Sequence, residues 1–307
     1  MRFGYMWLLF AVMTVLFWGS SDVIFKSVTN EKRADEFKLL ALNGIVYGVV
    51  CLIYWAVMRV EISWDILLKY LPIAAIYISS MLFYYKMMPR IKISLASPIA
   101  NSSCLLTTLL CVFVLKQTVE PVQAVAILLI VAALAALSFD KSEQAEKANA
   151  RDYLVGIGFA MLYFILDGVG SFLDDTILGE NDSAFAEKLF GGTLPENAVI
   201  IAYGIFYLVV GIVALIIAAK KSGKEALNFS FVKEPKILFG CLLETAGQFT
   251  YIFTYAAGDA AIASPFIASF AMVSVVLSHI FLKERLKLKQ YIAVAMILAG
   301  MFALSIE

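Results

Sequence analysis

The 307-residue sequence has little charge and few residues that bind metals or form disulfides. Only 16% of its residues are charged, and 24 basic residues balance 24 acidic ones, so no positive field is available to hold a nucleic-acid backbone. The single histidine, His279, excludes a histidine-rich metal site. The four cysteines lie inside apolar stretches without a CxxC pair, as expected of small buried side chains. Nucleic-acid partners and structural zinc are therefore excluded, and we expect no metal and no cofactor.

Apolar residues are abundant instead. They make up 62% of the chain, with a mean hydropathy of +0.88, against roughly 45–50% in an ordinary soluble domain. A water-soluble globule is excluded, because a bilayer core is crossed by about 20 mainly apolar helical residues and the chain holds many such stretches. The sequence predicts an all-α polytopic membrane protein with ten spans, at residues 5–26, 37–58, 70–88, 91–115, 121–139, 153–173, 198–219, 237–255, 260–282 and 290–306.

An internal repeat divides the chain into two halves. Residues 95–139 align without gaps on residues 262–306, at an offset of 167, with 14 identities in 45 positions. The identities include polar and punctuating residues as well as apolar ones, namely Ser97-Pro98 with Ser264-Pro265, Lys116 with Lys283, Gln123 with Gln290 and Ser138 with Ser305. We expect a first five-helix repeat at 1–139, a charged linker at 140–152 and a second repeat at 153–307, which includes an extended acidic loop at 174–197.

The odd number of spans in each half sets their relative orientation. After five crossings, the second copy enters the membrane from the opposite side, so a pseudo-two-fold axis in the membrane plane relates the halves. Secondary transporters use such inverted repeats, with the binding site between the halves near the midplane. The alternative is a duplicated scaffold or assembly factor. Inverted repeats allow two conformations of nearly equal free energy, one open to each side of the membrane, and a carrier uses both whereas a scaffold does not.

Three short motifs carry a resemblance to a known family. They are Phe-Trp-Gly-Ser-Ser at 17–21, the Ala-Ser-Pro turns at 96–98 and 263–265, and Leu-Lys-Glu-Arg-Leu at 282–286. With these motifs the whole chain resembles the EamA-type drug/metabolite transporter (DMT) superfamily. The resemblance implies a duplicated ten-helix carrier that moves small metabolites, often amino acids or amphipathic toxic compounds, outward. The sequence departs from the family at 116–118, where Gly-Glu is common, and in the long segment after the sixth span.

The distribution of positive charge predicts the orientation. Of the 24 lysines and arginines, 19 flank the loops after the odd-numbered spans, and 5 lie on the other side. The positive-inside rule then places both termini outside the cell (inner or plasma) membrane, whereas the family resemblance implies cytoplasmic termini. The segment 174–196 falls on the outer side, where Phe185 and Leu189 are spaced for one face of a short helix that caps the mouth. A solvated loop is the alternative.

Carboxylates inside spans are costly, so they are expected to face water, a partner or substrate. Glu244 lies well inside the eighth span and Asp167 inside the sixth, and both are candidates for proton or ion coupling. Asp22 in the first span is a third candidate, unless it simply pairs with Lys26 one turn later.

Other polar and aromatic residues predict the substrate site. One polar stripe begins at Glu244 and continues at helical spacing with Gln248, Tyr251 and Tyr255. A similar stripe contains Asp167 together with Tyr163 and Ser171, and it ends at Asp174. Aromatic walls with one or two carboxylates suit a zwitterionic or cationic amphipathic molecule, and the absence of arginine deep in a span argues against a phosphorylated one. The predicted substrate-binding residues are Trp18, Tyr84, Asn101, Gln248 and Tyr251.

Pro98 and Pro265 occupy equivalent positions near the starts of the fourth and ninth spans. Each removes a backbone hydrogen bond and frees a carbonyl, which predicts a pair of symmetric helix kinks beside the cavity. The alternative is that proline close to a helix start is accommodated without a kink.

Together these features favour a secondary active transporter that exports a small metabolite or amphipathic compound, with proton exchange as the drive. No GxxxxGK[ST] loop is present, which excludes ATP hydrolysis.

An intramembrane enzyme is disfavoured, because Ala256-Ala257-Gly258-Asp259 lacks the first glycine and a second aspartate of an aspartyl protease loop, and no catalytic residue is expected. A lipid flippase or channel of the same fold is the main alternative. The expected partners are a small-molecule substrate and the bilayer, and a homodimer is left open.

Overall fold

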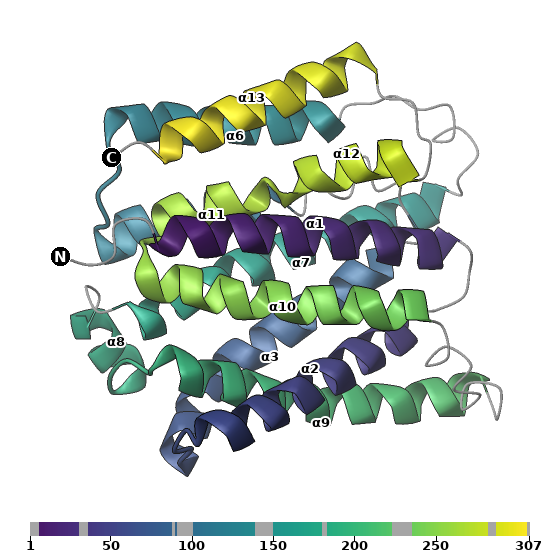
Figure 1. Cartoon of the computed structure of the whole chain (residues 1–307), viewed down its shortest axis with the longest axis vertical. Helices are drawn as coiled ribbons and strands as arrows, with labels where there is room; N and C mark the ends of the chain where they lie inside the picture. The colour runs from purple at the N-terminus through teal and green to yellow at the C-terminus, as the bar shows by residue number, and fades with distance from the viewer. Residues whose placement is uncertain are drawn as a thin grey trace.

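The structure is a computed structural model that describes residues 6–30, 36–87, 90, 101–138, 150–179, 183–222, 235–281 and 287–305. Every regular element in these ranges is a helix (Figure 1). The first half holds α1 (Met6–Asn30), α2 (Glu36–Met58), α3 (Trp64–Met87), α5 (Ser103–Leu110), the π-helix η1 (Cys111–Leu115) and α6 (Pro121–Ser138). The second half holds α7 (Ala150–Leu178), α8 (Ser183–Phe190), α9 (Glu196–Ser222), α10 (Pro235–Ala257), α11 (Ala260–Ala268), α12 (Phe270–Phe281) and α13 (Leu288–Leu304).

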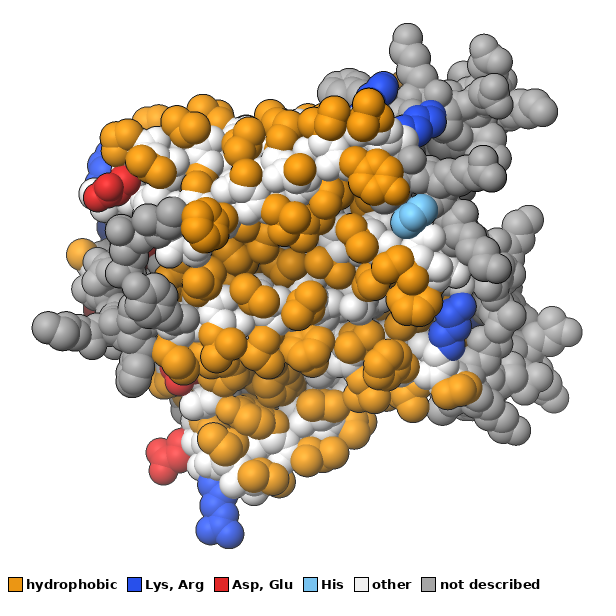
Figure 2. All heavy atoms as spheres, turned by 45° about the horizontal axis from the view of Figure 1, so that its top comes forward, with side chains coloured by type: hydrophobic (Ala, Val, Ile, Leu, Met, Phe, Trp, Pro, Cys, Tyr) orange, Lys and Arg blue, Asp and Glu red, His pale blue; other side chains and the backbone are white. Residues whose placement is uncertain are grey.

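Seven stretches of helix are long and apolar enough to cross a membrane, and they correspond to α1, α2, α3, α7, α9, α10 and the α11–α12 pair. Three shorter apolar stretches, at 103–115, 121–136 and 288–304, lie where the fourth, fifth and tenth spans were predicted. Figure 2 shows apolar side chains covering one face of the molecule, with charged side chains at its two ends. Within the described residues the regular structure is helical throughout, and the helices have the length and apolarity of the predicted polytopic membrane protein. Residues 91–100 of the predicted fourth span lie outside the described residues.

The helices pack in pairs that draw one member from each half. The closest pairs are α2 with α9, α1 with α10, α3 with α7 and α6 with α13 (Figure 1). A two-fold operation that exchanges the halves superimposes the α1–α10 pair on the α7–α3 pair. It superimposes each of the other two pairs on itself. The core is therefore built between the halves, not within each half.

Contacts at the helix ends give the chain directions. Trp7 at the start of α1 lies against Gly258 after α10, and its ring contacts that of Phe266 in α11. Asp175 at the end of α7 accepts a hydrogen bond from the backbone N–H of Ala260 at 3.1 Å. Thus α1 begins at the end of the bundle where α7 finishes, and these two helices run in opposite directions.

The same opposition holds for the other long helices. Tyr54 near the end of α2 donates to Asn197 at the start of α9 at 2.5 Å, and Tyr70 near the start of α3 donates to Asp174 near the end of α7 at 2.9 Å. We call this the α8 end of the bundle. At the other end, called the linker end, Lys236 in the first turn of α10 donates to Ser27 near the end of α1 at 2.5 Å.

A pair of glycines brings α2 and α9 into backbone contact. A Cβ built on Gly44 would lie 2.4 Å from the carbonyl oxygen of Tyr207 and 2.9 Å from the Cα of Gly211. A Cβ built on Gly211 would lie 3.0 Å from the Cα of Gly44. The two glycines are separated by 167 residues, the offset of the sequence repeat, so equivalent positions of the two halves touch each other here.

The α6–α13 pair repeats this relation with larger side chains. Ile130 and Ile297, also 167 residues apart, are both fully buried, and so are the equivalent Ala126 and Ala293. Gly300 packs directly against the side chain of Ile130. The repeat detected in the sequence therefore supplies both sides of this helix contact.

The segment predicted as an extended acidic loop at 174–197 is largely helical. The preceding helix α7 continues to Leu178, and α8 fills residues 183–190. Gly191 and Gly192 have φ values of +71° and +119°, which favour glycine and turn the chain sharply into α9. Of the two residues expected on one face of the short helix, Phe185 packs on Phe172 of α7 but Leu189 is 50% exposed.

The glycine contact generates a stability prediction. We expect Gly44→Ala to lower the free energy of unfolding by about 1–3 kcal/mol, because the added methyl group would overlap a backbone oxygen that cannot move aside easily. Thermal unfolding of the detergent-purified protein measures this. Gly158→Ala is the matched control, because a Cβ there has no neighbour within 4 Å. Equal melting temperatures for the two variants would show that α2 and α9 do not depend on this contact.

Candidate functional site

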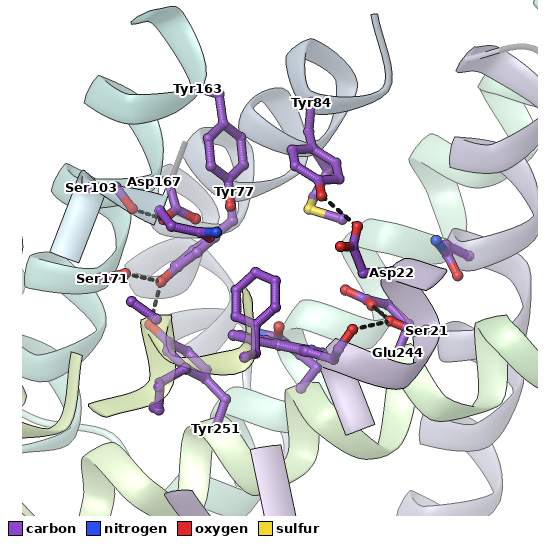
Figure 3. A pocket seen from close by; sticks show the side chains of 18 of the residues that line it. Ser21, Asp22, Tyr77, Tyr84, Ser103, Tyr163, Asp167, Ser171, Glu244 and Tyr251 are labelled. Atoms are coloured by element: carbon purple, nitrogen blue, oxygen red, sulfur yellow. Dashed lines mark hydrogen bonds between the residues drawn. The ribbon is translucent and has the colours of Figure 1, made fainter. Parts of the chain in front are cut away.

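A cavity lies between the two halves (Figure 3). Helices α1, α2, α3, α5, α7, α9, α10, α11 and α12 all contribute to its lining. The lining includes three carboxylates, Asp22, Asp167 and Glu244, and none of the described lining residues is lysine, arginine or histidine. It also includes nine tyrosines, namely Tyr47, Tyr77, Tyr84, Tyr85, Tyr163, Tyr203, Tyr207, Tyr251 and Tyr255. The cavity is thus aromatic and acidic.

Two of the carboxylates lie on the wall formed by α1 and α10. Ser21 donates to Glu244 at 2.5 Å, and Tyr84 donates to Asp22 at 2.7 Å. Glycine allows the two helices to approach, because a Cβ on Gly247 would lie 2.3 Å from the Trp18 ring. These contacts bring Asp22 and Glu244, which are more than 200 residues apart in the sequence, to the same part of the cavity.

The third carboxylate lies on the wall formed by α5 and α7. Ser103 donates to Asp167 at 2.6 Å, and Thr107 donates to the carbonyl oxygen of Gly168 at 3.1 Å. One turn before Asp167, the Tyr163 ring lies 5.1 Å from that of Tyr84. In Figure 3, Asp167 and Ser103 lie across the cavity from Asp22, Ser21 and Glu244.

A group of tyrosines, Tyr77, Tyr251 and Tyr255, closes the cavity toward the α8 end, and we call it the tyrosine layer. Tyr77 shares hydrogen bonds with Ser171, at 2.7 Å, and with Tyr251. The rings of Tyr251 and Tyr255 are 4.4 Å apart. All three tyrosines are buried, whereas Asp167 and Glu244 are partly exposed, so solvent reaches the level of the carboxylates but not the tyrosine layer.

A second polar layer lies beyond the tyrosines at the α8 end. Asp174, at the end of the stripe that contains Asp167, is 0% exposed and accepts a hydrogen bond from the hydroxyl of Tyr70. Asp175 accepts from the side-chain amide of Gln117 at 2.5 Å, and Gln117 in turn accepts the backbone N–H of Ala261 at 3.1 Å. Asp175 and Gln117 therefore satisfy the first N–H groups of α11, which have no partner within the helix.

The proline prediction is testable in the ninth span only, because Pro98 lies outside the described residues. Pro265 lies within α11, and the helix is interrupted at Ser269 before α12 begins. Proline has no N–H to donate to the carbonyl oxygen of Ala261, and the hydroxyl of Thr108 in α5 donates to that oxygen at 3.0 Å. The freed carbonyl thus joins α11 to the other half of the molecule.

All eight residues predicted to bind substrate or couple ions line this one cavity. They are Trp18, Tyr84, Asn101, Gln248 and Tyr251 for substrate, and Asp22, Asp167 and Glu244 for coupling. The cavity residues of α2 and α9, including Tyr47, Tyr203 and Tyr207, were not predicted from the sequence. These helices are so apolar along their length that their tyrosines form no distinct polar stripe, and their role emerges only when the halves are packed together.

The comparisons with known proteins agree with this architecture. The model of the EamA-like transporter family matches residues 5–139 and 185–306. The chain belongs to the EamA-like transporter family. Members of this family are membrane transporters of small substrates and not enzymes, so this chain is a multi-pass membrane transporter.

A solved structure described as "Crystal structure of protein" has the same fold. It aligns with a TM-score of 0.70 and 16% sequence identity, over 96% of this chain and 94% of its own. This likeness extends to the fold alone. Among curated proteins, the search found no match.

The Thr108 hydroxyl generates a test by double-mutant cycle. We expect Thr108→Val to destabilise the protein by about 1 kcal/mol, because the Ala261 carbonyl loses the hydroxyl that replaces the missing proline N–H. In a Pro265→Ala background the new N–H reaches Ala261, so the same change is expected to cost much less. Thermal unfolding of the four proteins gives the coupling energy. Equal costs of Thr108→Val in both backgrounds would contradict the assignment.

Proposed function

We propose that this protein is a secondary active transporter that carries a small metabolite or amphipathic compound (an amino acid, an amine or a drug-like molecule) by alternating access. The observation that carries the proposal is an acidic, tyrosine-rich cavity at the interface of two repeated halves, closed at one end by the tyrosine layer. Such a position between halves is where carriers with inverted repeats bind substrate.

The proposal includes ten membrane-spanning helices in two inverted five-helix repeats. Four observations support it: the sequence offset of 167, the contact of Gly44 with Gly211 at that offset, the opposite directions of equivalent helices, and the separate family matches in each half. An axis that exchanges the halves also inverts them across the membrane. Contacts between the halves that close one end of the cavity then have equivalents that can close the other end.

The carboxylates of the cavity supply the coupling in this proposal. A carboxylate that is largely withdrawn from water needs a proton or a cation close by. Lys26 is a cation acting on Asp22, but no basic side chain among the described lining residues is available to Asp167 or Glu244. Protons and a positively charged substrate group would then compete for the same acids. Entry of protons down their gradient would displace the substrate and so drive its export.

The orientation in the membrane follows from charge. We propose that the linker end faces the cytoplasm, because the loops on that side carry 19 of the 24 lysines and arginines. The protein would lie in the cell membrane with both termini outside. The tyrosine layer would then close the outer side of the cavity.

The coupling proposal is tested by Glu244→Gln. In reconstituted vesicles we expect this variant to lose uphill, proton-driven transport by at least tenfold, because glutamine keeps the shape of the side chain but neither gains nor loses a proton. Glu187→Gln is the matched control, since Glu187 is exposed on α8 and far from the cavity lining. Unchanged proton-linked flux in Glu244→Gln would remove this residue from the mechanism.

The orientation is tested with reporter proteins that fluoresce only in the cytoplasm. A reporter fused to the C-terminus is expected to remain dark, and the same reporter inserted in the linker at 140–149 is expected to fluoresce. The linker insertion shows that the fusion protein is made and inserted. A bright C-terminal fusion with a dark linker insertion would reverse the assignment.

A further inference from the structure

The two walls of the cavity differ in what they offer a ligand. The wall of α1 and α10 presents Asp22 and Glu244 side by side, whereas the wall of α5 and α7 presents Asp167 alone (Figure 3). A ligand that reaches from one wall to the other therefore meets negative charge at both of its ends. That arrangement matches a molecule with two separated cationic groups.

The wall of α1 and α10 also presents two hydrogen-bond donors. The indole Nε1 of Trp18 and the amide Nε2 of Gln248 are buried and have no hydrogen-bond partner in the part of the chain that the structure describes. Both atoms carry N–H groups that donate and never accept. A buried donor without an acceptor is unfavourable, so these two atoms point to an acceptor group on the ligand.

The donors and the acids of this wall form two adjacent levels. Trp18 precedes Asp22 by four residues on α1, and Gln248 follows Glu244 by four residues on α10. Since α1 and α10 run in opposite directions, both donors lie one helical turn, about 5.4 Å, nearer the α8 end than the acids. One wall thus provides an anionic level for an ammonium group and, next to it, a donor level for a carboxylate.

These features define the chemical class of the ligand, and the inference rests on the proposed transport function. We propose that the cavity binds a dibasic amino acid. Its α-ammonium group lies at Asp22 and Glu244, its carboxylate accepts from Trp18 and Gln248, and its distal cation lies at Asp167. Its aliphatic chain crosses between the aromatic rings, where the faces of tyrosines also attract the cations.

Simpler ligands leave part of the cavity unsatisfied. A neutral amino acid provides no cation for Asp167, whose carboxylate is held by the Ser103 hydroxyl and faces no basic residue among the described lining residues. A diamine leaves the N–H groups of Trp18 and Gln248 without an acceptor. Each truncation of the ligand therefore removes one of the two recognition elements.

Binding to the purified full-length protein tests the inference with three matched probes. L-lysine carries both elements, norleucine lacks the distal ammonium group, and 1,5-diaminopentane lacks the carboxylate. We expect calorimetry to give L-lysine at least a tenfold lower Kd than either truncated probe. Norleucine or 1,5-diaminopentane binding as tightly as L-lysine, or no binding of L-lysine at millimolar concentration, would overturn the inference.

Two variants assign the two elements separately. Asp167→Asn is expected to abolish the preference for L-lysine over norleucine and to keep the preference over 1,5-diaminopentane. Gln248→Met, which leaves Trp18 as the remaining donor, is expected to reduce the preference for L-lysine over 1,5-diaminopentane and to keep the preference over norleucine. Asp167→Glu, which keeps the charge, retains the preference for L-lysine over norleucine and so separates recognition from a loss of folding. If each variant weakens the binding of all three probes equally, the assignment is wrong.

Exchange of radiolabelled L-lysine across vesicle membranes separates this inference from the transport proposal. Selective binding without exchange would keep the ligand assignment and contradict a carrier function. Exchange of norleucine but not of L-lysine would keep the carrier function and overturn the ligand assignment.

Discussion

The proposed transport function depends on three carboxylates that face one cavity. The described residues that line this cavity offer the acids hydroxyl groups and include no basic side chain. Asp22, Asp167 and Glu244 each accept a hydrogen bond from a serine or tyrosine, which orients the acid. Lys26, one turn after Asp22 on α1, is a cation that acts on Asp22, whereas the described lining residues offer none to Asp167 and Glu244. A charge in such surroundings is unfavourable unless a proton or a ligand cation accompanies it. The stability of the site therefore depends on which proton or ligand cation is bound to these acids. A carrier that couples substrate to protons requires this dependence.

The surrounding fold keeps this cavity between the two halves of the chain. Small residues hold the halves in close contact at α2 and α9, where Gly44 meets Gly211, and at α6 and α13, where Gly300 meets Ile130. The tyrosine layer and the Asp175–Gln117 network add side-chain hydrogen bonds to the packing that closes the α8 end. Hydrogen bonds between side chains exchange readily for bonds to water, so this end is suited to open when the halves shift.

The sequence predicted much of this architecture because membrane helices follow strong local rules. Apolar length located the helices, and the offset of 167 identified the repeat whose equivalent positions Gly44 and Gly211 are in contact in the structure. The stripes on α7 and α10 predicted Asp167 and Glu244 as cavity residues, because a carboxylate in a span has few other places to lie. What remained hidden depended on contacts between distant segments. Asp175 caps a helix that begins 85 residues later, and Tyr203 joins the cavity only because α9 packs on α2 and α3.

The central claim is that a single site opens alternately to the two sides of the membrane. The most direct measurement is the labelling of Ser171→Cys, within the cavity and beside Tyr77, by a membrane-impermeant thiol reagent added to either face of vesicles. The four native cysteines are buried, and the wild-type protein gives their background. We expect labelling from both faces, with the preferred face changing when the proton gradient is reversed. Labelling from one face only, under every gradient, would contradict it.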